Sequence, residues 1–376
     1  MKFKLLLLLS LTLINSFLGI AQVSDFKEKF ELPTIVKETS GLLFINGKII
    51  THNDSGDTAN LYELDNSSGN LLRTIKINNA TNIDWEDITD DETHIYIGDF
   101  GNNNGTRTDL KIYKILKSDF ISNTNVSAEI ISFSYEDQTN FTSSDNHNFD
   151  AEAFVVYNNS LFIFTKNRGD FQTNVYKIPT IIGSHTAVKV STANIEGLIT
   201  GATLHNNIFM LCGYNESAIP FLIFISENRD SGDNIFNNGF EKHILNSELE
   251  QGSQVEAITS FDNGKFYISR ENVTNSFVNL PQRLFEFKDD RTKVLSIEKN
   301  NLTTLKISPN PTSNKIFINS NKKINSLTVF NTLGKKVLNV NSHQQEINIS
   351  QFPKGIYILK IKFYDGINVV RKIIKL

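Results

Sequence analysis

Short apolar runs recur along most of the chain, and polar turns rich in Asn, Asp and Gly separate them. Runs of this length, many with apolar and polar positions in alternation, are typical of β-strands. Ile, Val, Thr, Tyr and Phe are abundant and proline is scarce, which also favours strands. The pattern therefore predicts an all-β protein.

Five segments share one repeated pattern. Each begins with a Glu or Ser, continues with a small or acidic residue and an apolar one, and then has a turn, an apolar strand and a polar cluster. The five anchor residues are Ser40, Glu86, Glu152, Glu196 and Glu256. The polar cluster follows each anchor after 13 to 16 residues, and a further strand such as "NLYELD" or "LKIYKIL" comes next.

Repeated units of about four strands predict the blades of a β-propeller. A β-sandwich also contains many short strands, but it has no reason to repeat one polar residue in each sheet. Five blades are expected over residues 25–300, and a sixth would have to lack the anchor. The N-terminal segment "EKFELPTI" is expected to supply the last strand and so to close the ring.

The first 21 residues have the features of a secretory signal peptide. Lys2 and Lys4 precede an apolar stretch, and the small residues Gly19 and Ala21 precede an expected cleavage site before Gln22. The apolar stretch is too short to span a membrane, and no other run reaches the roughly 20 apolar residues required. An exported protein without a transmembrane segment is expected.

Charge divides the chain into two parts. Residues 303–376 carry 12 Lys and Arg against two acidic residues, whereas residues 23–302 have a net charge of −16. This asymmetry predicts two modules with separate partners. The acidic body argues against nucleic acid as a ligand, because phosphate binding needs clustered cations. The single cysteine, Cys212, excludes an intramolecular disulfide and is expected to be buried.

Residues 303–376 consist of short strands separated by turns and predict a small β-sandwich. The motifs "SPNPT" (308–312), "VFNTLGKKV" (329–337), "FPKGIYILKI" (352–361) and "RKIIK" (371–375) follow one another in this segment. In these motifs it resembles the type A C-terminal sorting domain of the type IX (Por) secretion system. The resemblance implies recognition by the type IX machinery and a secreted or cell-surface protein. An ordinary Ig-like module is the alternative.

The anchors predict a metal site. The innermost strand of each propeller blade faces the central channel, so residues at the start of these strands are expected to point to the axis. Four carboxylates in one ring must become protonated or share a cation. Because Ca²⁺ accepts large, irregular cages of oxygen ligands, we expect an axial Ca²⁺ bound by some of the glutamates, with Ser40 and waters. Alternatively, each glutamate caps backbone amides locally.

The stretch "NIDWEDI" surrounds the second anchor, Glu86. Its tryptophan, Trp85, is expected to pack between blades. Asp84 and Asp87 are expected either to support the anchor or to be solvated.

A ligand-binding face is expected where the second strand of each blade ends, because loops at one face of a propeller commonly carry the ligand site. Acidic residues of the first blades would oppose basic residues of later ones, which suits a polar or anionic ligand beside a cation. The candidates are Asp54, Asp99, Asn102, Lys166, Arg168, Arg270 and Glu271. Solvated turns are the alternative for each of them.

Two functions remain open. The motifs "ETSGL", "DWEDI", "DAEAF", "IEGL" and "VEAI" are similar to those of exported propellers of the SdiA-regulated and esterase-like phytase groups, and the anchors resemble those around the axial calcium of calcium-activated nucleotidases. The first function is a binding module for a glycan, peptide or envelope partner. The second is a calcium-dependent phosphoesterase or nucleotidase. The sequence has no GxSxG elbow and no HExxH motif, so it identifies no catalytic residue and favours binding.

Overall fold

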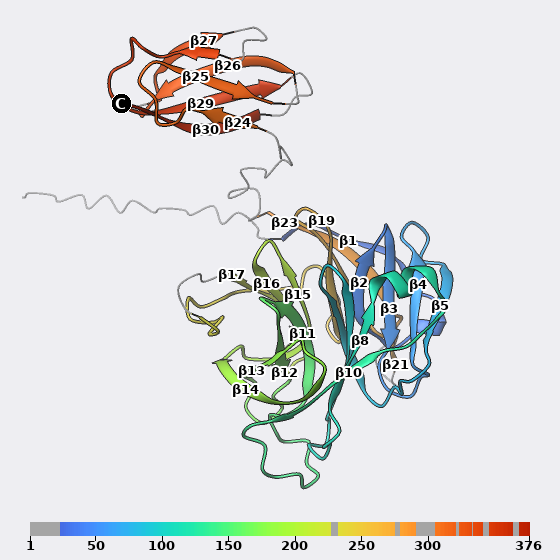
Figure 1. Ribbon diagram of the computed structural model, residues 1–376. Helices are drawn as coiled ribbons and strands as arrows, with labels where there is room; N and C mark the ends of the chain where they lie inside the picture. The colour runs from blue at the N-terminus through green and yellow to red at the C-terminus, as the bar shows by residue number, and fades with distance from the viewer. Residues whose placement is uncertain are drawn as a thin grey trace, which may run out of the picture. The chain divides into compact units, whose positions relative to one another are not determined.

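A computed structural model describes residues 23–226, 232–274, 279–290, 305–320, 323–332, 334–340, 346–363 and 368–376 (Figure 1). The chain divides into two compact units, Met1–Val294 and Leu295–Leu376. The expected signal peptide, residues 1–21, lies outside the described residues. Within the described residues the helices are α1 (Lys117–Ser122) and the 3-10 helix η1 (Thr34–Val36), and neither could cross a bilayer.

The first unit is built from four-stranded blades, in which the first strand is innermost. Blade 1 consists of β2 (Thr39–Ile45), β3 (Lys48–Asn53), β4 (Asn60–Asp65) and β5 (Leu71–Ile77). Blade 2 consists of β6 (Trp85–Asp90), β7 (His94–Asp99), β8 (Lys111–Leu116) and β10 (Glu129–Tyr135). Blade 3 consists of β11 (Ala151–Tyr157), β12 (Ser160–Thr165), β13 (Thr173–Pro179) and β14 (Gly183–Ala193). Blade 4 consists of β15 (Leu198–His205), β16 (Ile208–Tyr214), β17 (Pro220–Ser226) and β18 (Glu241–Ile244). Blade 5 consists of β19 (Val255–Asp262), β20 (Lys265–Arg270), β23 (Arg283–Asp289) and β1 (Val23–Glu31).

The inner strands of the blades form a closed ring. In the described part of the body, β2 contacts β6, β6 contacts β11, β11 contacts β15, β15 contacts β19, and β19 contacts β2 again. Radial repetition of four-stranded sheets around a central channel defines a β-propeller. The prediction of an all-β propeller is therefore confirmed.

The ring is closed by the N-terminal strand. β1 pairs antiparallel with β23, from Val23 opposite Asp289 to Glu31 opposite Arg283. Beyond the strand, the Gln282 side chain donates a 2.8 Å hydrogen bond to the Leu32 carbonyl oxygen. The expectation that the N-terminal segment supplies the last strand is confirmed.

Blades 2 and 3 are also joined at their outer edges. β10 pairs in parallel with β14, from Ile131 opposite Gly183 to Tyr135 opposite Ala187, so the two blades form one eight-stranded sheet. The short strand β9 (Asn125–Val126) extends blade 1 by pairing in parallel with β5. The two-residue strands β21 (Val273–Thr274) and β22 (Asn279–Leu280) pair with each other.

Apolar side chains fill the space between neighbouring blades. Trp85 is fully buried in a cluster with Leu43 and Ile50 of blade 1 and with Ile95 and Ile97 of blade 2. Its indole nitrogen donates to the carbonyl oxygen of Thr81 at 3.0 Å, so burial leaves this polar atom paired. Trp85 therefore packs between blades, as its position in the repeat predicts. Cys212 is likewise buried.

The second unit contains two sheets around one core. One sheet consists of β24 (Lys306–Ser308), β25 (Lys315–Asn319) and β28 (Glu346–Asn348). The other consists of β27 (Lys336–Val340), β26 (Ile324–Asn331), β29 (Gly355–Phe363) and β30 (Asn368–Lys375). Ile316 and Ile347 of the first sheet pack in one cluster with Leu327 and Leu359 of the second, which is the arrangement of a β-sandwich.

Candidate functional site

Each inner strand has a β-bulge near its start. The pairing with the second strand skips one residue in every blade, and the skipped residues are Ser40, Glu86, Glu152, Thr200 and Glu256. A bulge leaves one residue out of the ladder and re-aims its side chain. Every blade therefore has the same β-bulge at one end of the channel, and this bulge underlies the motif that repeats in the sequence.

The structure corrects the fourth anchor. Glu196 lies in the turn before β15, where it is exposed and has a φ of 52°. Thr200 occupies the bulge of blade 4, and its hydroxyl donates to the carbonyl oxygen of Val255 at 2.5 Å. The prediction was wrong by four residues because "IEGL" has the form of the repeated motif. Its spacing of 16 residues to the polar cluster, against 13 or 14 in the other blades, was the available signal.

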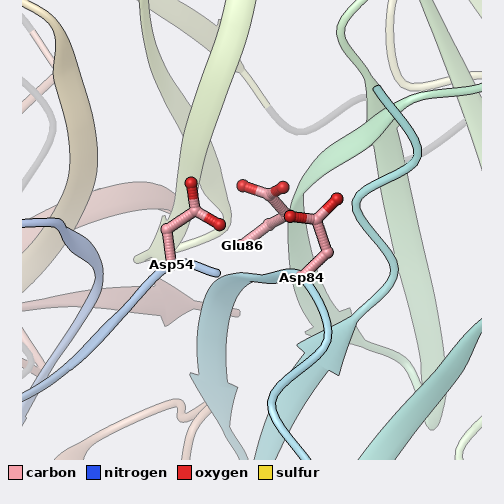
Figure 2. Close-up of side chains that lie close together, drawn as sticks. All are labelled: Asp54, Asp84 and Glu86. Carbon is pink, nitrogen blue, oxygen red and sulfur yellow. The ribbon is translucent and has the colours of Figure 1, made fainter. Parts of the chain in front are cut away.

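Three carboxylates meet at this end of the channel (Figure 2). Asp54 follows β3, Asp84 precedes β6 and Glu86 is the bulged residue of blade 2. Each offers an oxygen atom within 4.8 Å of the others, and Figure 2 shows their side chains directed toward a common space. Asp84, expected only to support the anchor or to be solvated, therefore belongs to the cluster itself.

Glu86 is the most enclosed of the three. Its side chain is 3% exposed, and its Oε1 atom has no hydrogen-bond partner among the described residues. Gly101 packs directly against it, since a Cβ atom at this position would lie 2.0 Å from Glu86 Oε1 and 2.5 Å from Asp84 Oδ2. The missing side chain of Gly101 thus leaves room for the two carboxylates.

Burial and mutual repulsion favour the protonated forms of these acids. Burial raises the pKa of Asp54 to about 8, and the charges of Asp84 and Glu152 add to this effect. Burial, followed by the charges of Glu152 and Asp54, raises the pKa of Glu86 well above its usual range. Burial and the charge of Asp150 raise the pKa of Asp84. A cation between the carboxylates would remove this penalty.

Lys166 balances the carboxylates of the later blades. Its Nζ lies 3.0 Å from Glu152 Oε1, and both side chains are almost completely buried. Burial alone would lower the pKa of Lys166, but the charges of Glu152 and Glu256 hold it well above its usual range. The pKa of Glu152 is nevertheless raised to about 7 by burial. Lys166 is therefore an internal counterion of the inner strands.

Arg168 lies at the edge of the same site. It forms an ion pair with Asp150, donates to Asn103 Oδ1 at 2.8 Å, and lies 3.9 Å from Glu152 Oε1. Its side chain remains 27% exposed. Glu271, which follows β20, is half-buried, and burial raises its pKa to about 7. Arg168 and Glu271 are the expected ligand-face residues that border the carboxylates and remain open to solvent.

Asp99 and Asn102 hold neighbouring loops together through hydrogen bonds. Asp99 accepts hydrogen bonds from Arg107 Nη2 at 3.0 Å and from the Asp84 backbone amide at 3.2 Å. Asn102 donates to the carbonyl oxygen of Phe149 at 3.0 Å, and its backbone amide donates to Asp150 Oδ1 at 2.6 Å. Both side chains are buried and have internal partners in place of the expected ligand, although Asp99 Oδ2 accepts no hydrogen bond among the described residues and has Lys111 Nζ 3.9 Å away.

Arg270 is also internal. Its guanidinium donates to Glu250 at 2.7 Å and to Ser253 Oγ at 3.1 Å, and it lies 5.5 Å from the centre of the Phe285 ring. With 2% of its surface exposed, it fixes the loop before β19 to blade 5. Arg270 was predicted to contact a ligand, and this prediction was wrong. The sequence does not show that its guanidinium is bonded inside the protein.

Asp87 ties three inner strands together. Its carboxylate accepts from the backbone amides of Ile88 at 2.8 Å, Phe154 at 3.1 Å and Ala202 at 3.3 Å. It is fully buried, and burial raises its pKa well above the usual range. Neither expectation for Asp87, support of the anchor or solvation, describes this role.

Comparison with known proteins identifies the tail. Residues 306–376 match the family described as the secretion system C-terminal sorting domain. This sorting domain directs the protein through type IX secretion, so the protein is secreted or held at the cell surface. Among curated proteins, none matches the chain.

Solved structures similar to the chain have low sequence identity. PorZ of the Porphyromonas gingivalis type IX secretion system is 12% identical with a TM-score of 0.33, and the match covers 90% of this chain but only 45% of PorZ. An α-L-arabinanase from Penicillium chrysogenum is 8% identical, with a TM-score of 0.42 and coverage of 71% of this chain and 98% of its own. An exo-β-1,3-galactanase from Phanerochaete chrysosporium is 9% identical, with a TM-score of 0.46 and coverage of 93% and 100%.

Proposed function

We propose that the body is a calcium-dependent binding module of an exported protein. Ca²⁺ is held at one mouth of the central channel by Asp54, Asp84 and Glu86. The observation that carries the proposal is the buried, unpartnered Oε1 atom of Glu86, which faces two further carboxylates. A buried polar atom without a partner is costly, and a cation would satisfy it.

The chemistry of the donors favours calcium. Ca²⁺ takes six to eight oxygen ligands in flexible geometry, whereas Mg²⁺ demands a near-ideal octahedron and keeps several waters. Three carboxylates from two loops and a bulge form an irregular set that leaves coordination positions for water or for a ligand. A polar or anionic ligand bound to the cation would also reach the partly exposed Arg168.

Binding is favoured over the alternative of a calcium-dependent phosphoesterase. In that alternative, Lys166, Arg168 or Arg270 would offset the charge of a phosphoryl group. Lys166 is instead paired with Glu152 inside the ring, and Arg270 is paired with Glu250 in the loop before β19. This leaves only the partly exposed Arg168, which also pairs with Asp150, to balance the charge of a phosphoryl group.

Calcium titration of the full chain after EDTA treatment and dialysis tests the proposal. We expect one Ca²⁺ per chain by isothermal titration calorimetry, and in Glu86→Gln and Asp84→Asn a loss of affinity of at least the roughly 10- to 100-fold that changes outside the ligand shell cause. Asp262→Asn is the matched control, because Asp262 is an exposed carboxylate at the end of β19 and is paired with Lys265 at 2.8 Å. Unchanged calcium affinity in Glu86→Gln would contradict the site.

A turnover assay separates the two functions. The calcium-loaded protein is incubated with nucleotides, phytate and an aryl phosphate. The binding proposal predicts no release of phosphate above that of the Glu86→Gln variant. Release that depends on calcium and is lost in Arg168→Ala would establish the hydrolase in its place.

A further inference from the structure

A second candidate site lies in blade 5, formed by residues other than those of the calcium site. The strands β1, β23, β20 and β19, together with the β4–β5 turn of blade 1, line a groove of about 560 Å³. Volumes of this size are typical of small-molecule sites. In the pairing of these strands, Lys27 and Tyr267 both lie opposite Glu286, so the groove follows side chains that are neighbours across the sheet.

The groove is basic although the body is strongly acidic. Its lining includes four lysines, Lys27, Lys29, Lys265 and Lys288, against two acidic residues, Asp25 and Glu286, and Lys265 also pairs at 2.8 Å with Asp262 beside the groove. Lys27 and Lys29 share one carboxylate, since their Nζ atoms lie 2.9 and 3.3 Å from the two oxygens of Glu286. A local excess of positive charge attracts anions, and it contrasts with the net charge of −16 over residues 23–302.

The groove also has a flat aromatic wall. The rings of Phe261 and Tyr267 stack with centroids 3.9 Å apart and an angle of 8° between their planes. Tyr267 is held in place because its hydroxyl donates to Asn66 at 2.7 Å and Lys29 Nζ lies 5.2 Å from the centre of its ring. Phe261 is half-buried whereas Tyr267 is buried, so the part of this wall that faces the groove is Phe261, and Lys265 Nζ lies 6.0 Å from the centre of its ring. The wall is preformed and loses little freedom when a ligand binds.

We infer that the groove binds an acidic saccharide. A sugar ring presents a flat apolar face to Phe261, while a carboxylate on the sugar pairs with the lysine ammonium groups. An acidic peptide would satisfy the lysines equally, but it does not supply the flat face that the stacked wall matches. The combination of aromatic wall and lysines therefore favours a sugar acid over a peptide or a neutral sugar.

Titration of the full chain with three probes tests this inference. The probes are a glucuronic acid trisaccharide, a neutral glucose trisaccharide and a glutamate tripeptide, at low and at physiological salt. We expect the acidic trisaccharide to bind more tightly than the other two, with an affinity that falls as salt rises. Phe261→Ala is expected to weaken its binding about tenfold, because the aromatic contact is lost.

The contribution of the groove lysines to binding of the acidic trisaccharide is tested by Lys288→Gln, with Lys189→Gln as the matched control. Both lysines are about 40% exposed and form ion pairs, Lys288 with Asp25 and Lys189 with Asp137. We expect about fivefold weaker binding in Lys288→Gln and no change in Lys189→Gln. Equal binding of the acidic and neutral sugars, tighter binding of the peptide, or no binding of the acidic sugar would overturn the inference. Because these probes need no calcium, failure here leaves the proposed calcium site intact.

Discussion

The hydroxyl of Ser40 donates a 2.5 Å hydrogen bond to the main-chain carbonyl oxygen of Glu86, so that the bulge of blade 1 is bonded to the bulge of blade 2. Thr200 makes the equivalent bond from blade 4 to blade 5, where it reaches the carbonyl oxygen of Val255 at 2.5 Å. The bulge residues thus fall into two kinds. Glutamates supply charge at the mouth of the channel, and hydroxyl residues link neighbouring inner strands.

Removing these hydroxyl groups should lower stability without affecting calcium. We expect Ser40→Ala and Thr200→Val each to reduce the free energy of unfolding by about 1–3 kcal/mol, because a buried carbonyl oxygen loses its donor. Urea unfolding monitored by tryptophan fluorescence measures the change. Thr200→Ser is the control and should retain most of the stability. A clear loss of calcium affinity in either variant would show that these hydroxyls are more than structural links.

Gly101 should be required for calcium binding. A methyl group there would collide with Glu86 Oε1 and Asp84 Oδ2, so Gly101→Ala must displace at least one of these carboxylates. We expect calcium affinity to fall about 10- to 100-fold, by calorimetry. The circular dichroism spectrum of the calcium-free variant checks that the fold is intact. Wild-type affinity in a folded Gly101→Ala protein would place the ion elsewhere.

The calcium-free protein should become less stable as pH rises from about 4.5 to about 8. Unfolded carboxyl groups titrate near pH 4, whereas the folded-state pKa is about 8 for Asp54 and about 7 for Glu152 and Glu271. Between these values the folded state binds more protons than the unfolded state, so the free energy of unfolding falls with rising pH.

Calcium should reverse this loss, because the ion takes the place of the protons. We expect the rise in melting temperature on adding Ca²⁺ to be larger at pH 8 than at pH 5.5. Thermal unfolding in EDTA and in Ca²⁺, at both pH values, measures this rise in melting temperature. Asp54→Asn should flatten the pH dependence of the calcium-free protein. A calcium effect that is larger at pH 5.5 would contradict the linkage.

Lys166 should be essential for folding stability. Lys166→Met leaves Glu152 and Glu256 buried without their counterion, and we expect the free energy of unfolding to fall by about 3–5 kcal/mol. The double variant Lys166→Met/Glu152→Gln should recover part of the loss. Lys177→Met, which removes a partly exposed partner of Asp233, is the control and should cost less than about 1 kcal/mol. Equal effects of the two single variants, measured by urea unfolding, would contradict an internal role for Lys166.

The sequence predicts the propeller because the fold repeats a local feature. Every bulge lies at the start of an inner strand, so Glu86, Glu152 and Glu256 recur at a similar distance from the turn that follows. The closing strand could also be expected, because a ring needs a final strand and the N-terminal segment has the alternation of one. Local pattern and global fold agree in these places.

The site was less predictable because it depends on contacts between blades. Thr200 was missed because Glu196, four residues earlier, lies in "IEGL", which has the form of the repeated motif, although the hydroxyl residue Ser40 was recognised as the anchor of blade 1. Asp84 lies near Asp54 only because two loops come together in the fold, and no repeated pattern in the sequence predicts that contact. Arg270 has the sequence context of a ligand-face residue, but its guanidinium is committed to Glu250 and Ser253.

The pairing of β1 with β23 has a consequence for the order of folding. These strands are the first and last of the propeller, so the ring cannot close until nearly the whole body has been synthesised. Contacts between such distant parts of a chain form late and slow the folding of the whole domain. The closed propeller is therefore a product of the complete body, and a body interrupted before β23 would leave β1 without its partner strand.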